Sequence, residues 1–125
     1  MYMEKTTLQR ETLKLALETL QIGALLQEKK EFILSKQLIR SGTSIGALIS
    51  EAKFAESRKD FIHKYHIALK EANETNYWLE LLTGSGKLDS ESSVSIQKRV
   101  GKVISILVKS IKTLKSRPDQ TVLGG

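Results

Sequence analysis

Two parts of one stretch decide the fold: Lys36-Gln37-Leu38-Ile39-Arg40-Ser41-Gly42-Thr43-Ser44-Ile45-Gly46, and then Lys59-Asp60-Phe61-Ile62-His63-Lys64 running on to Tyr77-Trp78-Leu79-Glu80-Leu81-Leu82. Apolar or small residues recur through both parts at alternating spacings of four and three, which is the period of one face of an α-helix. The two rows are Leu34, Leu38, Ser41, Ile45, Leu48 and Ala52, and then Phe61, Tyr65, Ala68, Ala72, Thr75, Leu79 and Leu82. The stretch therefore predicts two consecutive amphipathic helices.

The first of these helices contains Gly42 and Gly46. Glycine inside a helix costs about 1 kcal/mol relative to alanine. Either the helix kinks near Ser41 and Gly42, or it is continuous and its small residues let a neighbouring helix approach closely. We favour the continuous helix, because the apolar period stays in phase through the small residues.

Two further amphipathic segments flank this stretch. In the segment before it, Leu13, Leu17, Leu20 and Ala24 form one helical face, and a second row, Leu8, Leu15, Ile22 and Leu26, lies beside it. In the segment after it, the core row is Ile96, Val100, Val103, Leu107, Ile111 and Leu114. The sequence thus predicts an all-α fold, an antiparallel up-down-up-down four-helix bundle. We expect the bundle over residues 1–116, with helices at about 6–30, 31–55, 58–83 and 90–115, and a flexible C-terminal tail at 117–125.

Length and composition are those of one soluble domain. The chain has 125 residues, of which 40% are hydrophobic and 27% charged. The absence of cysteine excludes disulfides, thiolate catalysis and cysteine metal sites. No apolar run approaches the roughly 18 residues that span a bilayer, and the first residues do not resemble a secretory signal. We expect a cytoplasmic protein without a membrane partner.

The net charge of +6 is concentrated near the end of the chain. From Lys98 onward seven basic residues stand against one acid, Asp119, whereas the charges before Lys98 cancel. The candidate nucleic-acid-binding residues are Lys98, Arg99, Lys102, Lys109, Lys112 and Lys115. Lysines along a helix can neutralise a phosphate backbone without reading sequence, but a solvated face that complements the helix dipole would show the same pattern. Both interpretations stay open.

The motifs that would indicate catalysis fail on inspection. Thr83-Gly84-Ser85-Gly86-Lys87 lacks the first glycine and the hydroxyl residue of a phosphate-binding loop, and we interpret it as a helix-ending turn. His63 and His66 do not complete a Glu-x-x-His di-iron set, and the glutamates Glu51, Glu71 and Glu74 have no nucleophile beside them. We expect no enzyme activity, no catalytic residue, no metal and no cofactor.

The helix at 58–83 carries more apolar surface than one core row needs. The surplus residues are Ile62, Leu69, Tyr77 and Trp78. Surplus apolar surface on a small bundle is typical of a subunit interface. We therefore expect these four residues to lie in an oligomer interface.

The motifs in the deciding stretch also carry a family resemblance. They are Gln37-Leu38-x-Arg40-Ser41-x-x-Ser44-Ile45-Gly46-Ala47, Glu51-Ala52, Ser57-x-Lys59-Asp60-Phe61-x-x-Lys64, Ala68-Leu69-Lys70-Glu71-Ala72-x-Glu74-Thr75 and Tyr77-Trp78-Leu79-x-Leu81-Leu82. In these positions the chain resembles the four-helix-bundle proteins encoded in intervening sequences of bacterial 23S ribosomal RNA genes. One departure is Leu48, where that family commonly has asparagine.

The resemblance implies an antiparallel four-helix bundle that assembles as a ring-shaped homopentamer and has no established catalytic activity. A similar bundle is the accessory protein of diversity-generating retroelements, a basic pentamer that binds nucleic acid and a reverse transcriptase. The matched polar positions, which the resemblance implies to be an inter-helix polar network, are Arg40, Ser41, Ser44, Glu51, Lys64, Glu71 and Glu74.

The sequence-based hypothesis is a non-enzymatic, oligomeric helical bundle that binds RNA or DNA weakly and without sequence specificity. A reverse transcriptase or another protein is a further candidate partner. The alternative is a protein–protein interaction scaffold with no nucleic-acid role, in which the lysines serve solubility alone.

Overall fold

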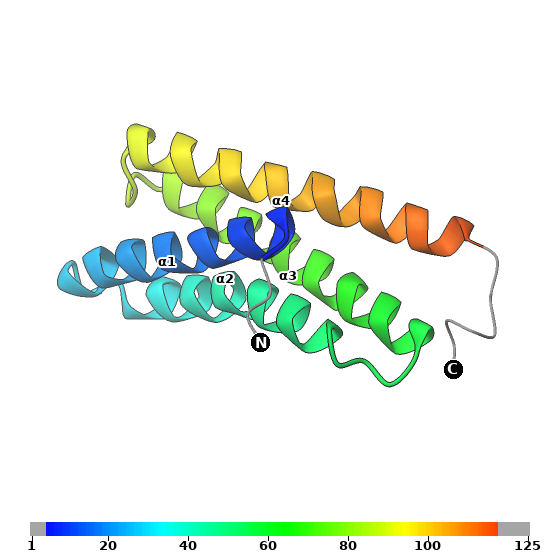
Figure 1. Cartoon of the computed structure of the whole chain (residues 1–125). Helices are drawn as coiled ribbons and strands as arrows, with labels where there is room; N and C mark the ends of the chain where they lie inside the picture. The colour runs from blue at the N-terminus through cyan, green and yellow to red at the C-terminus, as the bar shows by residue number, and fades with distance from the viewer. Residues whose placement is uncertain (1–4, 118–125) are drawn as a thin grey trace.

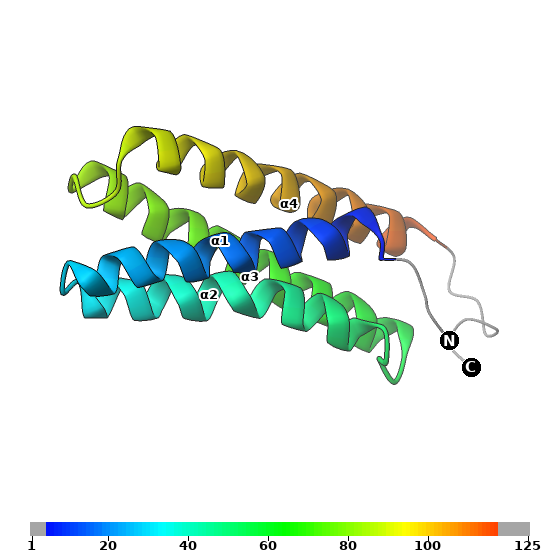
Figure 2. The ribbon, with the colours of Figure 1, turned by 60° about the vertical axis from the view of Figure 1, so that its left-hand side comes forward.

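Four helices account for most of the computed structural model, which describes residues 5–117. They are α1 (Thr7–Glu28), α2 (Phe32–Ala52), α3 (Arg58–Gly84) and α4 (Ser90–Ser116). Each helix runs antiparallel to the one before it, and short turns connect them (Figures 1 and 2). Helices α1 and α3 each pack against α2 and α4, which places α1 and α3 on opposite corners of the bundle. The prediction of an all-α four-helix bundle is confirmed. Residues 118–125 of the expected tail lie outside the described residues.

Side-chain caps fix where three of the helices begin. Thr6 and Gln9 form a reciprocal capping box at the start of α1, which satisfies amide groups that have no partner within the helix. Ser57 accepts a hydrogen bond of 3.0 Å from the amide of Asp60 at the start of α3. At the start of α4, Asp89 accepts a hydrogen bond of 2.9 Å from the amide of Ser92. Hydrogen bonding to Ser92 lowers the pKa of Asp89.

The turns that end α1 and α3 share one backbone pattern. At the end of α1, the amide of Glu31 donates to the carbonyl of Leu26. Lys30, which follows the C-cap residue Lys29, has a φ of 63°. At the end of α3, the amide of Lys87 donates to the carbonyl of Leu82, and Gly86 has a φ of 75°. Both are Schellman motifs, in which glycine is the usual left-handed residue. The first motif therefore carries a strained lysine where the second has glycine.

The core of the bundle follows the expected rows of α2, α3 and α4 closely, but not that of α1. On α1 the buried row is Leu8, Leu15, Ile22 and Leu26. The row that we placed beside it is exposed, with Leu13, Leu17 and Leu20 between 47% and 52% accessible. Treating both rows as one apolar face was wrong, because the helix periodicity does not say which of two adjacent leucine rows a neighbour covers. We call Leu13, Leu17, Leu20 and Ala24 the leucine stripe.

Helix α2 is continuous through its glycines, as we favoured. A Cβ atom at Gly42 would lie 2.3 Å from Cγ2 of Thr19, and one at Gly46 would lie 3.2 Å from Oγ1 of Thr12. Both threonines belong to α1. The glycines therefore allow the close approach of α1 and α2, and the cost to helix propensity is offset by this packing.

Candidate nucleic-acid interface

The structure divides the basic residues of α4 into two groups. Near the start of the helix, Arg99 donates hydrogen bonds to Glu11, at 2.6 Å, and to Glu18, both on α1. Lys102 places its Nζ atom 3.6 Å from Glu11. Glu11 and Glu18 offset the charges of these two side chains, so they contribute less to a phosphate-binding surface than unpaired lysines do, although the side chain of Lys102 is 56% exposed. Arg99 and Lys102 thus form the first group among the six candidate nucleic-acid-binding residues.

Glu11 explains why that pairing forms. It is the one charged side chain among the buried residues of the part of the chain that the structure describes. Burial acts to raise the pKa of Glu11, but attraction by Lys102 and the hydrogen bond from Arg99 outweigh it, and the pKa is lowered. Burial acts likewise to lower the pKa of Arg99, but its bonds to Glu18 and Glu11 raise it. The ion pairs thus hold α1 to α4 with both partners charged.

The other candidates on α4 are exposed and lack such partners. Lys98 stands at the start of this group, and Lys109, Lys112 and Lys115 follow in the second half of the helix. Within residues 5–117 no carboxylate forms an ion pair with any of these four side chains. The last three occupy positions 109, 112 and 115, a spacing of three that keeps them on neighbouring parts of the helix surface.

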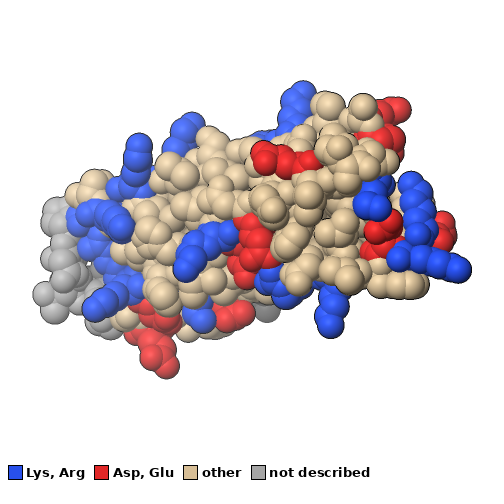
Figure 3. Space-filling model, turned by 180° about the vertical axis from the view of Figure 1, so that it is seen from behind, with Lys and Arg blue, Asp and Glu red and all other residues tan. Residues whose placement is uncertain are grey.

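Basic side chains from other helices meet the end of α4. Since α1 and α3 begin where α2 and α4 end, one end of the bundle collects the segments at residues 53–60 and 109–117 (Figure 1). Figure 3 shows blue side chains gathered at this end, beside the grey residues. The basic end consists of Lys53, Arg58, Lys59, Lys109, Lys112, Lys115 and Arg117. The acids in the same segments are Glu56 and Asp60.

Arg58 joins the two segments. Its guanidinium group donates to the carbonyl oxygens of Leu114 and, at 2.9 Å, Arg117. Arg58, Lys59, Lys115 and Arg117 line one shallow cleft with Ile62, and Arg58 and Arg117 also line a second cleft with Lys53. Basic groups from α3 and α4 and from the residues that follow α2 and α4 therefore surround concave surface at one end of the bundle.

Helix dipoles do not decide the potential at this end. Two helices begin here and two end here, so their partial charges of opposite sign offset each other. The charged side chains remain, and seven basic groups stand against two acidic ones in the named segments. This excess favours the binding of an anion, and of a polyanion most of all.

The polar positions implied by the resemblance lie between α2 and α3. Arg40 Nη1 lies 3.3 Å from Glu71, and Arg40 also donates to Glu74, which accepts a bond of 2.9 Å from Trp78 Nε1. Lys64 lies 3.2 Å from Glu51. Ser41 Oγ lies 3.0 Å from the buried hydroxyl of Thr75, whereas Ser44 bonds to the carbonyl of Ser41 on its own helix. Leu48 packs against the core.

The four residues expected in an oligomer interface differ in how far the chain itself buries them. Leu69 and Trp78 pack against the core of their own chain. Ile62 is half-buried and lines the cleft at the basic end. Tyr77 is 56% exposed, and its ring meets that of Trp78 edge-on at 5.2 Å.

Sequence reasoning missed three features of the surface. It did not single out Lys53, Arg58 or Lys59, because they lie far from α4 along the chain and only the antiparallel topology brings them to its end. It treated Arg99 and Lys102 as equivalent to the other candidates, because the acids that hold them are more than eighty residues away. It also placed the leucine stripe in the core.

Other kinds of site find little support in the part of the chain described. No group of three His, Asp or Glu side chains gathers there as the ligands of a metal ion would. No helix within residues 5–117 combines the length and hydrophobicity needed to cross a membrane. Each buried side-chain nitrogen or oxygen among these residues has a hydrogen-bond partner, so none is left directed at an absent ligand.

These features define a basic, antiparallel four-helix bundle. Its family is shown by the match of residues 4–109 to the model of the 23S rRNA-intervening sequence protein. The chain belongs to this family, and the resemblance noted from its motifs is confirmed.

A solved structure agrees with this assignment. It is the crystal structure of a protein of unknown function from the S23 ribosomal protein family of Bacteroides thetaiotaomicron VPI-5482. The two sequences are 46% identical, the match covers 85% of this chain and 99% of that chain, and the TM-score is 0.83. No curated protein matches the chain. The family and the similar structure do not indicate an enzymatic activity.

Proposed function

We propose that this protein is a non-enzymatic, self-associating helical bundle that binds RNA or DNA without sequence specificity through its basic end. The observation that supports this most is the group Lys109, Lys112 and Lys115, which is exposed and unpaired by carboxylates of residues 5–117. Lysines in this state can exchange counterions for phosphates, which favours binding to any nucleic acid strand.

The binding surface in this proposal differs from the face of α4 that the sequence suggested. Arg99 and Lys102 pair with Glu11 and Glu18, and Arg58 donates to carbonyls at the end of α4. The phosphate-contacting residues in this proposal are therefore Lys109, Lys112 and Lys115 together with Lys53, Lys59 and Arg117. Lys98 stands apart from them on the first half of α4. Aromatic side chains also lie at this end, since Phe54 is 85% exposed and Phe61 and Tyr65 line a cleft with Lys109 and Arg117. Base stacking can therefore accompany the phosphate contacts.

Self-association would strengthen the binding of nucleic acid, because the basic end of one chain is small. A handful of phosphate contacts gives dissociation constants of about 10⁻⁴–10⁻⁶ M at physiological salt. Several copies held together could engage one strand at once, which raises the apparent affinity without any new contact. The family resemblance favours a ring of five copies, and we propose this assembly for the present chain. The resemblance also makes a reverse transcriptase a candidate protein partner.

Charge reversal tests the binding surface. The end variant carries Lys109→Glu, Lys112→Glu and Lys115→Glu, and its control carries Lys29→Glu, Lys36→Glu and Lys70→Glu, three exposed lysines elsewhere on the bundle. Both variants change the net charge equally. We expect the end variant to lose at least tenfold in affinity for a fluorescent single-stranded RNA and the control to change much less. Equal losses in both variants would contradict a localised site.

The competing function is a scaffold for protein partners, which the exposed leucine stripe favours. Purification from a fresh lysate separates the two functions. A nucleic-acid binder should copurify with RNA or DNA that high salt removes, whereas a scaffold should elute with a protein and a low absorbance ratio at the nucleic-acid wavelength. The end variant should lose the copurifying nucleic acid.

A further inference from the structure

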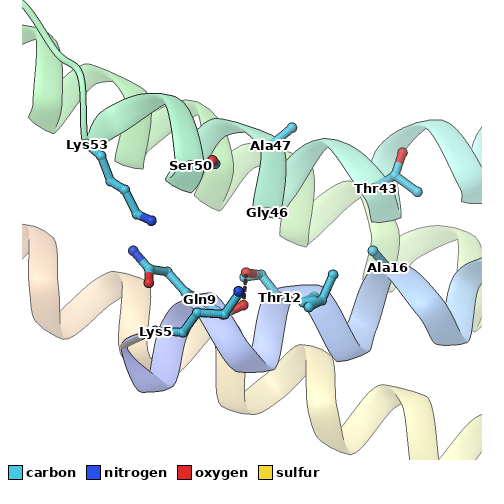
Figure 4. Close-up of a pocket in the computed structure, with 10 residues that line it drawn as sticks. Lys5, Gln9, Thr12, Ala16, Thr43, Gly46, Ala47, Ser50 and Lys53 are labelled. Carbon is cyan, nitrogen blue, oxygen red and sulfur yellow. Dashed lines mark hydrogen bonds between the residues drawn. The ribbon is translucent and has the colours of Figure 1, made fainter. Parts of the chain in front are cut away.

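Two apolar surfaces of the bundle remain uncovered in a single chain. The first is the leucine stripe on α1, whose spacing of four, three and four resembles that of the buried rows. Beside it a groove runs between α1 and α2, lined by the small residues Ala16, Thr43, Gly46, Ala47 and Ser50 (Figure 4). The stripe itself contains no charged side chain. Three leucines that are each about half exposed form a large apolar surface for a soluble bundle, and such surfaces usually have a binding role.

The second surface lies over α2 and α3, and we call it the aromatic patch. It consists of Ile33, Tyr77, Trp78 and Leu81. Arg40 of α2 contacts Glu74 of α3. Ile33 lies two helical turns before Arg40 on α2, and Leu81 lies two turns after Glu74 on α3. Because α2 and α3 are antiparallel, these two steps run in the same direction and place Ile33 beside Leu81. Ile33 is 79% exposed, and Tyr77 and Leu81 are 56% and 40% exposed.

The two surfaces differ in shape and in neighbouring charge. The groove is concave, and its lining side chains are small, whereas the aromatic patch presents bulky side chains. The charged residues that line the groove are Lys5 and Lys53, both basic. The charged residues beside the aromatic patch are of both signs, Lys36 and Arg40 on α2 and Glu74 and Glu80 on α3, and Arg40 pairs with Glu74. A concave groove lined by small side chains therefore complements the bulky patch in shape better than either surface complements itself.

We propose that the leucine stripe and groove of one copy receive the aromatic patch of a second copy. This inference rests on the self-association included in the proposed function and identifies its surfaces. A two-fold contact through either surface would leave the other exposed, whereas a head-to-tail contact covers both on every interior copy. Head-to-tail contacts build closed rings when the rotation closes.

Complementation between two variants tests this arrangement. The stripe variant carries Leu13→Glu and Leu17→Glu, and the patch variant carries Ile33→Glu and Tyr77→Glu. The control carries Leu25→Glu and Val94→Glu, two exposed apolar residues outside both surfaces. We expect the wild type and the control to sediment as the same oligomer and each test variant to sediment as a monomer. A mixture of the two test variants should form a dimer, because each retains the surface that the other lacks.

The outcomes separate this inference from the proposed function. A patch variant that still assembles, or a mixture that yields no dimer, would overturn the head-to-tail contact. If neither variant changed the oligomer, the assignment of the two surfaces to the interface would be wrong, but self-association itself would stand. A monomeric wild type at micromolar concentration would contradict self-association itself, and RNA binding is measured separately on the end variant.

Cross-linking provides a second readout that needs no disruptive charge. The chain has no cysteine, so introduced thiols are unique. With a short bifunctional maleimide, we expect a ladder of linked chains from the variant carrying both Leu17→Cys and Tyr77→Cys. Either cysteine alone should give little product. Efficient linkage of Leu17→Cys to itself would show a two-fold contact through α1 and overturn the proposal.

Discussion

Arg99 donates a hydrogen bond of 2.6 Å to Oε1 of Glu11, and the two residues join α4 to α1 across 88 positions of sequence. Glu11 is buried, so its charge is compensated by nearby cations rather than by water. The contact has two consequences. It stabilises the packing of the first helix on the last, and it withdraws Arg99 from the surface available to nucleic acid.

Removal of Arg99 should therefore affect stability more than binding. We expect Arg99→Met, which keeps an apolar stem, to lower the free energy of unfolding by about 2 kcal/mol, because Glu11 loses its closest cation. Lys98→Met, at an exposed neighbouring position, should change it by less than about 0.5 kcal/mol. Urea denaturation measures both. A large loss of RNA affinity in the folded Arg99→Met protein would contradict the division of α4 into two groups.

Glu11 should also make stability depend on pH. Its pKa is lowered from 4.5 in the folded chain, so the stabilisation from its charge is fully present above pH 4.5. It should be lost as the pH falls through the lowered folded value, because protonation then weakens the contacts with Arg99 and Lys102. Glu11→Gln should be less stable than the wild type near neutrality and show a smaller decline below pH 4.5. An identical decline in the variant would show that other carboxylates are responsible.

Two glycines provide a matched test of the helix contacts. Gly42→Ala should destabilise the bundle by about 1–2 kcal/mol, because the added Cβ atom meets Thr19 and this clash exceeds the gain in helix propensity. Gly101 lies in α4, and nothing surrounds its Cβ position within 4 Å. Gly101→Ala should therefore stabilise the protein by up to about 1 kcal/mol. Thermal denaturation should shift in opposite directions for the two variants, and a shift in the same direction would contradict the close approach.

The Schellman motifs allow a similar comparison. Lys30 has a φ of 63°, which costs a residue with a side chain roughly 1 kcal/mol, so Lys30→Gly should stabilise the turn after α1 by up to that amount. Gly86→Ala should destabilise the turn after α3 by a similar amount, since Gly86 has the same backbone conformation. Chemical denaturation measures both effects. A destabilised Lys30→Gly would indicate that the lysine side chain contributes more than its backbone costs.

The sequence specified the bundle well because each of three helices has one apolar row that keeps its phase along the helix. In α3, the row that includes Ala68, Ala72 and Leu79 is buried, whereas the surplus residues Ile62 and Tyr77 stay at least partly exposed. In α1 two leucine rows lie side by side, and periodicity alone cannot decide between Leu15 and Leu17. The choice depends on Gly42 and Gly46, which bring Thr19 and Thr12 against α2 and so turn the stripe outward.

The candidate binding surface was less accessible to sequence reasoning. Charge spacing along α4 treats Arg99 and Lys112 alike, although Glu11 and Glu18 neutralise the first and leave the second exposed. The contribution of Arg58 depends on its bonds to the last carbonyls of α4, which is a tertiary contact. Both features follow from how helices meet in space, and neither has a local signal in the sequence.

The salt dependence of RNA binding tests the central claim most directly. On a plot of log affinity against log salt for a single-stranded RNA, each phosphate-contacting lysine should contribute a slope of about −0.7. We expect Lys109→Ala, Lys112→Ala and Lys115→Ala together to reduce the magnitude of the slope by roughly 2 for each subunit engaged. The same slope in the wild type and the triple variant would show that these lysines contact no phosphate, and it would contradict the proposed basic end.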